Sequence, residues 1–195
     1  YPMNALVEDP LSRLRTALDT PEIASWRGEN EAGCIYFGRY VGPTPTSGNA
    51  SDQDAVGRNQ ERLAEELMRA EVIRGHAEEW ADEDDLDADE ARRRLGSLTL
   101  FPRMDGTEMR SRWDMQHAAP DVMITNSSML SIMLMREQED GIFEQTRRYL
   151  DEVEGARLSI VMDELHLARG SSGSEMAYLM RTLLRRLDLT PDDPR

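Results

Sequence analysis

The sequence contains no lysine. All 23 of its basic residues are arginine, and with 38 aspartates and glutamates the 195 residues carry a formal net charge of −15. A phosphate loop of the form GxxxxGK[ST] is therefore absent, and with it the backbone cradle and the lysine that hold the β- and γ-phosphates of a nucleotide. The acidic balance also argues against simple nucleic-acid binding, because Lys and Arg supply most non-specific affinity for phosphates.

Cysteine and long apolar runs are scarce as well. The single Cys34 cannot form an internal disulfide, and with no His or Cys partners nearby it is no metal site. We therefore expect a reducing, cytoplasmic location. The longest apolar stretch, Met129 to Met135, is far too short to span a bilayer, and no signal peptide is recognised, so we expect no membrane partner.

The composition predicts one α/β domain with part of its length in solvated helix or loop. Apolar residues make up 39% of the chain and charged residues 31%. Residues 78–90 hold nine acids, so the negative charge is partly local. Before this run, apolar residues recur every three to four positions from Leu63 to Trp80, which predicts a helix of roughly 25 residues. We interpret residues 47–104 as a helical, acidic insert.

Local patterns predict the remaining elements. Apolar spacing and turn residues mark helices and strands on both sides of the insert. The expected elements are a helix within residues 1–20 with Pro10 in its first turn, a buried strand at Cys34–Phe37, a strand buried on both faces at Val122–Thr125, a core helix at Met129–Met135 capped by Ser127 or Ser128, an amphipathic helix at Phe143–Leu150, and a helix after Gly170–Ser174.

Asp163-Glu164-Leu165-His166 follows the apolar run Leu158–Met162. This pattern predicts a buried strand that delivers two adjacent carboxylates at its carboxyl end. P-loop NTPases use such a pair to hold Mg²⁺ and to orient a water against the γ-phosphate. Short acidic tetrapeptides also occur on solvated turns, so the motif needs support from other segments.

Three further segments carry a family resemblance. Residues 1–15, which begin YPMNALVED and include Arg13 and Arg15, are similar to motif Ia and its trailing helix, commonly written YPMNALVNDQxxRLR. Pro120–Leu130 is similar to PDILITNYSML, and Val161–Leu187 is similar to VVDELHTYRGTQGAEVALLLRRLL. With DELH, these blocks resemble the first RecA-like domain of superfamily 2 helicases of the DEAD/DEAH-box kind, and above all large bacterial DELH-box helicases. They follow the family's order and cover roughly half of the chain.

The resemblance implies a fold, an activity and cofactors. The fold would be a partial RecA-like P-loop NTPase domain over residues 1–195, α/β with a parallel sheet flanked by helices. The activity would be ATP hydrolysis coupled to movement along a DNA or RNA strand, with ATP and Mg²⁺ as cofactors. Asp163 would hold the Mg²⁺ through a water, and Glu164 would orient the attacking water or accept its proton. His166 would couple the nucleotide site to the strand-binding face.

The same resemblance implies which residues meet the strand. Motif Ia would place four residues near the sugar-phosphate backbone, namely Pro2, Asn4, Ala5 and Arg13. Thr125 and Asn126 would contact the strand at the carboxyl end of a parallel strand, where ligands collect in α/β sheets. Asn126 also fits a turn residue that tolerates unusual backbone angles. Gly38–Pro45 resembles the family's YTGDTP region beside the DNA path, and equally fits an ordinary Gly/Pro loop.

A hypothesis of a different class is a non-catalytic RecA-like module whose acidic insert binds a protein partner or mimics the charge of nucleic acid. Asp163 and Glu164 favour the motor. The missing phosphate-loop lysine favours the module, unless a phosphate loop lies upstream in a longer protein. We expect the chain to be a fragment of such a protein, whose second RecA-like lobe completes the motor, and to be inactive as an ATPase by itself.

Overall fold

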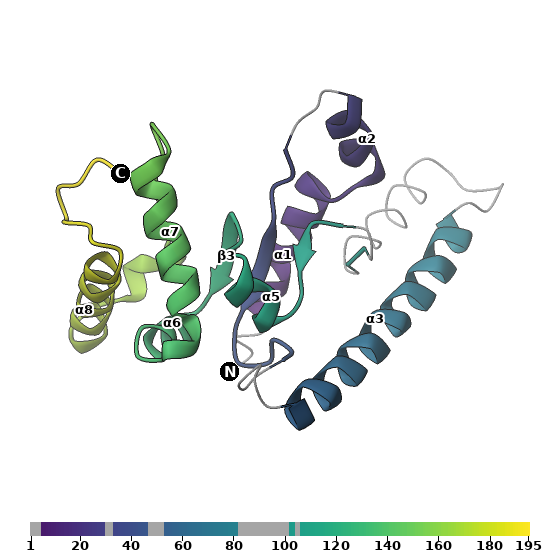
Figure 1. Cartoon of the computed structure of the whole chain (residues 1–195), viewed down its shortest axis with the longest axis horizontal. Helices are drawn as coiled ribbons and strands as arrows, with labels where there is room; N and C mark the ends of the chain where they lie inside the picture. Colours follow the sequence, from purple (N-terminus) through teal and green to yellow (C-terminus); the bar gives the residue numbers. More distant parts are fainter. Residues whose placement is uncertain (1–4, 30–32, 47–52, 82–101, 104–105) are drawn as a thin grey trace. The chain divides into compact units, whose positions relative to one another are not determined.

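The computed structural model describes residues 5–29, 33–46, 53–81, 102–103 and 106–195. They form an α/β structure in which helices flank a small sheet (Figure 1). The chain divides into unit 1, Tyr1–Trp113 with Pro120–Ile124, and unit 2, Asp114–Ala119 with Thr125–Arg195. Among the described helices, none has the length and apolar character needed to cross a membrane.

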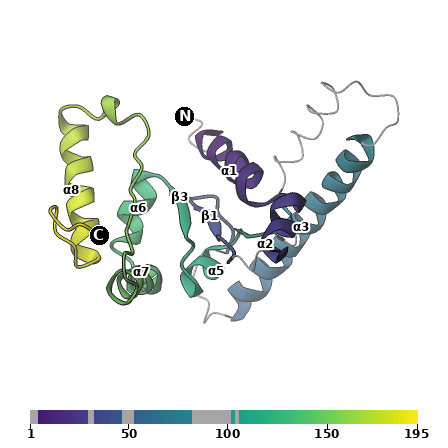
Figure 2. The same cartoon turned by 90° about the horizontal axis from the view of Figure 1, so that it is seen from above.

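The elements alternate between helices and short strands. In chain order they are α1 Ala5–Leu18, α2 Pro21–Glu29, β1 Phe37–Tyr40, α3 Gln53–Ala81, β2 Glu108–Met109, α5 Arg112–His117, β3 Val122–Thr125, α6 Ser127–Met133, η1 Glu137–Glu139, α7 Asp140–Glu152, η2 Leu165–Leu167 and α8 Ser171–Arg186. The sheet order is β2-β1-β3, so β1 is its central strand and β3 lies beside it (Figure 2). β1 and β2 run parallel, with Phe37 opposite Glu108.

Helix α1 contacts β1 and buries a stripe of residues spaced by four. Val7 and Leu11 are buried on this face, with 6% and 0% of their surface exposed. Residues four apart share one face of an α-helix, so Arg15 and Asp19 continue the same stripe just beyond the apolar pair. The position of Pro10 was predicted wrongly: it lies inside α1 and not in its first turn.

The charged half of the stripe meets the segment that forms β2. Arg15 donates from Nε and Nη2 to the two carboxylate oxygens of Glu108, at 2.6 and 2.9 Å, and both side chains are over nine-tenths buried. Asp19 accepts the Thr107 backbone N–H at 3.0 Å. A buried charge is tolerated only when it is paired, and here the pairing joins α1 to the sheet. Burial lowers the pKa of the nearby Arg110 guanidinium, while Glu108 and Asp19 oppose that shift.

The strands differ from the predictions in register and burial. The first strand was expected at residues 34–37, but β1 is Phe37–Tyr40, and Ile35 and Tyr36 before it are 43% and 48% exposed. Phe37 and Tyr40 are fully buried, and the glycine and arginine between them hid the strand signal. β3 has the predicted bounds, yet all four of its residues are only half-buried, because it lies at the edge of the described sheet.

Unit 2 packs helices around an apolar core. Its fully or nearly buried apolar side chains come from α5, α6, α7 and the end of α8, namely Met115, Met129, Met133, Ile142, Phe143, Leu150, Leu183 and Leu187. α6 and α8 are in contact with each other. The predicted helix from residue 129 to 135 is partly confirmed, because α6 ends at Met133 while Met135 is 77% exposed. The helices predicted over 143–150 and after residue 174 are present as α7 and α8.

Helix α3 is the long helix predicted within the insert. It spans 29 residues. Leu63, Leu67 and Ala70 are half-buried, whereas Ile73 is 47% exposed, so the apolar stripe is narrow, as its spacing indicated. Most of the acidic run falls in residues 82–101, outside the described part of the chain. The boundaries of the insert, 47–104, therefore remain a prediction.

The buried pair predicts a strong contrast between two arginines of α1. Arg15→Met should destabilise the chain by about 3 kcal/mol, because it leaves the Glu108 carboxylate buried without its partner. Arg13→Met is the matched control: the Arg13 side chain is 80% exposed and pairs only with Asp9, so its loss should cost less than about 1 kcal/mol. Urea unfolding of both variants measures the difference. Equal losses of stability would show that the Arg15–Glu108 pair does not hold α1 to the sheet.

Candidate functional site

The two predicted catalytic carboxylates lie on an exposed turn that leads into η2. Asp163 Oδ1 accepts the Glu164 backbone N–H at 2.9 Å, and the Glu164 carbonyl accepts the Leu167 N–H at 2.8 Å. Glu164 has left-handed backbone angles, φ 49° and ψ 31°, which are uncommon for a residue other than glycine. Such angles cluster at functional sites. Bonds within the turn thus hold the Asp163 carboxylate and the Glu164 backbone.

His166 lies next to this pair. Its Nε2 is 3.3 Å from Glu164 Oε2, and both side chains are more than half exposed. The His166 carbonyl accepts Arg169 Nε at 3.0 Å, which tightens the turn before α8. An exposed contact of this kind adds little stability, so it positions side chains more than it stabilises the fold.

The apolar run before the turn does not form the predicted strand. In the described structure Leu158–Met162 carries no strand assignment, and Val161 is 92% exposed. The Leu158 backbone N–H donates to the Arg195 carbonyl at 2.7 Å rather than to a neighbouring strand. The prediction of a buried strand is therefore wrong for this structure. Such a run is buried only when strands lie on both sides of it, and the described sheet contains only β1, β2 and β3.

Thr125 and Asn126 lie where they were predicted, at the carboxyl end of a strand. Thr125 is the last residue of β3, and Asn126 directly follows it. Asn126 is the N-cap of α6: its backbone is extended, and its Oδ1 accepts the Met129 N–H at 2.8 Å. This corrects the prediction that Ser127 or Ser128 caps the helix. The N-cap role also explains Asn126 without unusual backbone angles.

The motif Ia residues are only partly within the described chain. Pro2 and Asn4 lie outside the described residues, and Ala5 begins α1. Arg13 projects from α1 into solvent and pairs with Asp9 at 2.9 Å. Ala5 and Arg13 belong to unit 1, whereas the acidic turn, Thr125 and Asn126 belong to unit 2.

The acidic turn suits a magnesium ion that is shared with a phosphate ligand. Within the described residues no group of three or more His, Cys, Asp or Glu side chains could hold a metal alone. Mg²⁺ in nucleotide sites usually takes one or two carboxylates and fills its remaining positions with water and phosphate oxygens. Asp163 has one oxygen bonded to the Glu164 N–H, which leaves Oδ2 as a hard oxygen donor. The donor set therefore fits Mg²⁺ bound together with a nucleotide.

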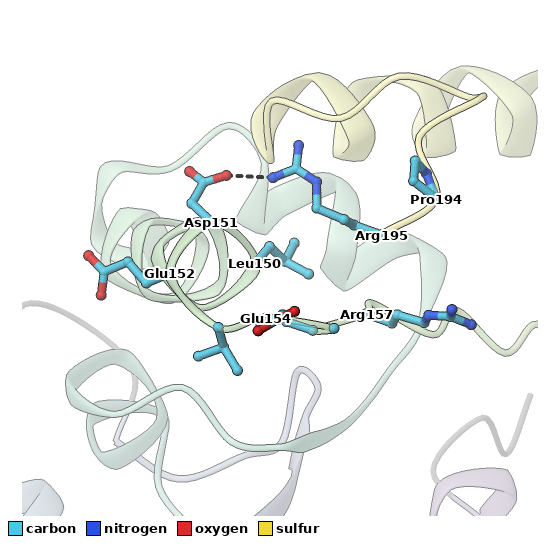
Figure 3. Close-up of a pocket in the computed structure, with 10 residues that line it drawn as sticks. Leu150, Asp151, Glu152, Glu154, Arg157, Pro194 and Arg195 are labelled. Carbon is cyan, nitrogen blue, oxygen red and sulfur yellow. Dashed lines mark hydrogen bonds and ion pairs between the residues drawn. The ribbon is translucent and has the colours of Figure 1, made fainter.

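A hollow of about 500 Å³ in unit 2 does not contain these residues. It is lined by residues 150–157, which include the end of α7 and the segment after it, and by Pro194 and Arg195 (Figure 3). Arg195 bonds Asp151 at 2.5 Å across it and also bonds Asp193, and these bonds raise the pKa of the guanidinium. All three guanidinium nitrogens of Arg195 thus donate to Asp151 or Asp193, and we assign the hollow no ligand.

The sequence alone did not point to Arg112 and Thr44. Both are buried, and both bind the loop that follows β1. The only sequence signal was the Gly/Pro/Thr pattern of that loop, because an arginine far along the chain cannot be matched to a loop without the fold.

The cap predicts how Asn126 responds to substitution. Asn126→Ala should lower the stability of unit 2 by about 1 kcal/mol, because the Met129 N–H loses its acceptor. Asn126→Asp keeps the acceptor and should be close to neutral. Ser128→Ala, at an exposed position in the first turn, is the control and should change stability by less than about 0.5 kcal/mol. Thermal melting followed by circular dichroism tests all three, and a Ser128→Ala loss that exceeds the Asn126→Ala loss would contradict the cap.

Comparison with known proteins gives one likeness. No protein-family model matches the chain, and no solved structure matches it. The chain is similar to Druantia protein DruE of Escherichia coli (strain UMEA 4076-1), with 33% identity over 216 residues that take in 97% of this chain. The match spans only 12% of the length of that protein. The likeness thus covers both units.

Proposed function

We propose that this chain is part of the first RecA-like lobe of an ATP-driven helicase or translocase that moves along a DNA or RNA strand. The observation that carries the proposal is the adjacent pair Asp163 and Glu164, exposed on a tight turn directly before a helix, within sequence blocks in helicase order. The α/β architecture with a parallel pair of strands is compatible with a RecA-like lobe. The likeness to Druantia protein DruE supports the same class of protein.

The two carboxylates have different roles in this proposal. Glu164 accepts a proton from the attacking water or orients that water, since its side chain is exposed and open to a ligand. Asp163 contributes an oxygen ligand to Mg²⁺, which supplies charge stabilisation of the phosphates when bound. His166, 3.3 Å from the Glu164 carboxylate, holds that side chain and links it to the start of α8.

Strand contacts fall on Ala5, Arg13 and Thr125. Arg13 supplies a solvent-exposed positive charge in an acidic chain, and Thr125 supplies a hydroxyl at a strand end. Asn126 contributes mainly by starting α6, because its side-chain oxygen already accepts a backbone N–H. A few contacts through hydroxyl groups, amides and arginine suffice to position a strand, so a net charge of −15 does not exclude this role.

The motor needs parts that these residues do not supply. In this proposal the phosphate-binding loop and the second RecA-like lobe come from other parts of a longer protein. The match to Druantia protein DruE spans only 12% of the length of that protein, which leaves room for such parts. A strand of that protein beside Leu158–Met162 would bury the apolar run and fix the acidic turn at a strand end.

A second candidate function is a protein-binding module. Met68 and Val72 lie one turn apart on α3 and are 69% and 58% exposed, which gives this helix an apolar face suited to a partner. The acidic insert would then act without catalysis. Strand-stimulated ATP hydrolysis by the full-length protein separates the two functions, because the module predicts none.

The chain by itself should not hydrolyse ATP. Positioning and charge stabilisation of the triphosphate require the phosphate loop, and this sequence has no lysine with which to form one. Phosphate release would be measured with and without single-stranded DNA and RNA. Release above a blank without protein would contradict the expectation and would require a different nucleotide site.

In the full-length protein, Glu164→Gln and Asp163→Asn should give different defects. Glu164→Gln should abolish turnover while nucleotide and strand binding persist, because glutamine keeps a hydrogen-bonding oxygen but cannot take a proton. Asp163→Asn should also weaken the affinity for the Mg²⁺-nucleotide, because the carboxylate charge acts on the metal already in the ground state.

Steady-state ATPase assays and nucleotide binding would be compared for both variants. Glu175→Gln, an exposed acid on α8, is the matched control and should behave as wild type. Turnover by Glu164→Gln within a few-fold of wild type would overturn the catalytic assignment and the helicase proposal with it.

A further inference from the structure

Several hydrogen bonds hold the loop that follows β1, Val41–Thr46. The Thr44 hydroxyl accepts the Val41 N–H at 3.0 Å and donates to the Arg39 carbonyl at 2.9 Å. The Thr46 hydroxyl accepts the Trp113 N–H at 3.3 Å. Val41, Thr44 and Thr46 are buried and Pro45 is half-buried, whereas Gly42 and Pro43 at the tip of the loop are exposed.

Arg112 holds this tip from beneath. Its Nη2 donates to the carbonyls of Val41 and Gly42 at 2.9 and 2.6 Å, and its guanidinium lies over the Tyr40 ring at 5.6 Å. Arg112 is only 6% exposed. Its own backbone N–H donates to the Pro45 carbonyl at 3.1 Å, so backbone and side chain both bind the loop. Burying a charge is costly, and the two hydrogen bonds to the Val41 and Gly42 carbonyls offset part of that cost.

The bond to Val41 determines which way the next amide points. The described chain has no cis peptide bond, and in a trans peptide the carbonyl and the N–H point in opposite directions. Because the Val41 carbonyl turns inward to Arg112 and to the Thr44 N–H, the Gly42 N–H turns outward. Gly42 is exposed, and no protein acceptor for its N–H is found among the described residues. The tip thus offers a backbone donor to an anionic oxygen.

We propose that Arg112 is a positioning residue that fixes the Val41–Thr46 loop so that the Gly42 N–H donates to a phosphate of the nucleic-acid strand. The inference rests on the proposed helicase function, in which this loop lies beside the strand, and it adds the role of Arg112 in fixing the loop. Backbone amides are a usual source of phosphate contacts, and they carry no sequence preference. Arg112 does not touch the strand: it draws two carbonyl oxygens inward, which removes their negative ends from the surface that faces the phosphate.

The test uses the full-length protein with Arg112→Gln and Arg112→Lys. Binding of a fluorescein-labelled single-stranded oligonucleotide, as DNA and as RNA, is measured by anisotropy. Arg112→Gln should weaken strand affinity about tenfold, which corresponds to about 1.4 kcal/mol. Arg112→Lys should weaken it less, because an ammonium keeps the charge but lacks the planar fork. At saturating strand, kcat and the KM for ATP should stay at the wild-type values.

Two further pairs of variants separate positioning from folding and from charge. Thr44→Val removes the hydroxyl that closes the same loop and should reproduce the Arg112→Gln loss, while Thr44→Ser should rescue it. Arg148→Gln makes the same change in net charge at an exposed position of α7 and should bind the strand like wild type. Because Thr44→Val leaves Arg112 intact, the strand affinity of this variant still tests the role of the loop if Arg112→Gln fails to fold.

The outcomes are distinct. If wild type binds the strand and both Arg112→Gln and Thr44→Val stay within about twofold of it, the positioning role is overturned and the helicase proposal stands. Equal losses in Arg148→Gln and Arg112→Gln would also overturn it, because net charge would then explain the effect. A wild-type protein that binds neither DNA nor RNA overturns the proposed function, and this inference with it.

Discussion

Unit 1 depends on one buried ion pair, Arg15 with Glu108. Both side chains are more than nine-tenths buried, Arg15 on the buried stripe of α1 and Glu108 on β2, and two hydrogen bonds join them. An apolar stripe would let α1 slide along the sheet, whereas a bidentate pair has one favourable geometry. A second ion pair, between Glu8 and Arg39, joins the same helix to β1. The segment that resembles motif Ia is thereby fixed to the strand whose loop Arg112 holds.

The acidic turn of unit 2 is held in a different way. The bonds of Asp163 and Glu164 described above lie within residues 163–169, and the apolar residues on both sides, such as Val161 and Leu167, are exposed. Exposed apolar surface next to charged residues is typical of a segment that is completed by another part of a protein. The residues proposed for chemistry therefore need neighbours to be fixed, while the residues proposed to position the strand already have theirs.

Periodicity predicted the helices well, because a repeat of three to four residues is a local property that survives folding. The long helix α3, the amphipathic α7 and the helix after the DELH sequence all follow from it. The bounds of the strands and the N-cap residue of α6 were harder to predict from the sequence. β1 begins where the expected strand ends, and the cap of α6 is Asn126 and not a serine, since either residue type can accept the same N–H. The acidic pair was found from the sequence, but its exposed, left-handed turn was not.

The sequence by itself determined the amphipathic helices, the adjacency of Asp163 and Glu164, and the absence of a phosphate-loop lysine, because each depends only on neighbours along the chain. The tertiary structure decided which charges are buried and what they bind. Arg15 and Glu108 are 93 residues apart, and Arg112 is 70 residues from the Gly42 carbonyl that it holds. Such pairs leave no local pattern, since a buried arginine and an exposed one have the same letter, and only the fold brings the partner that makes burial of the charge tolerable.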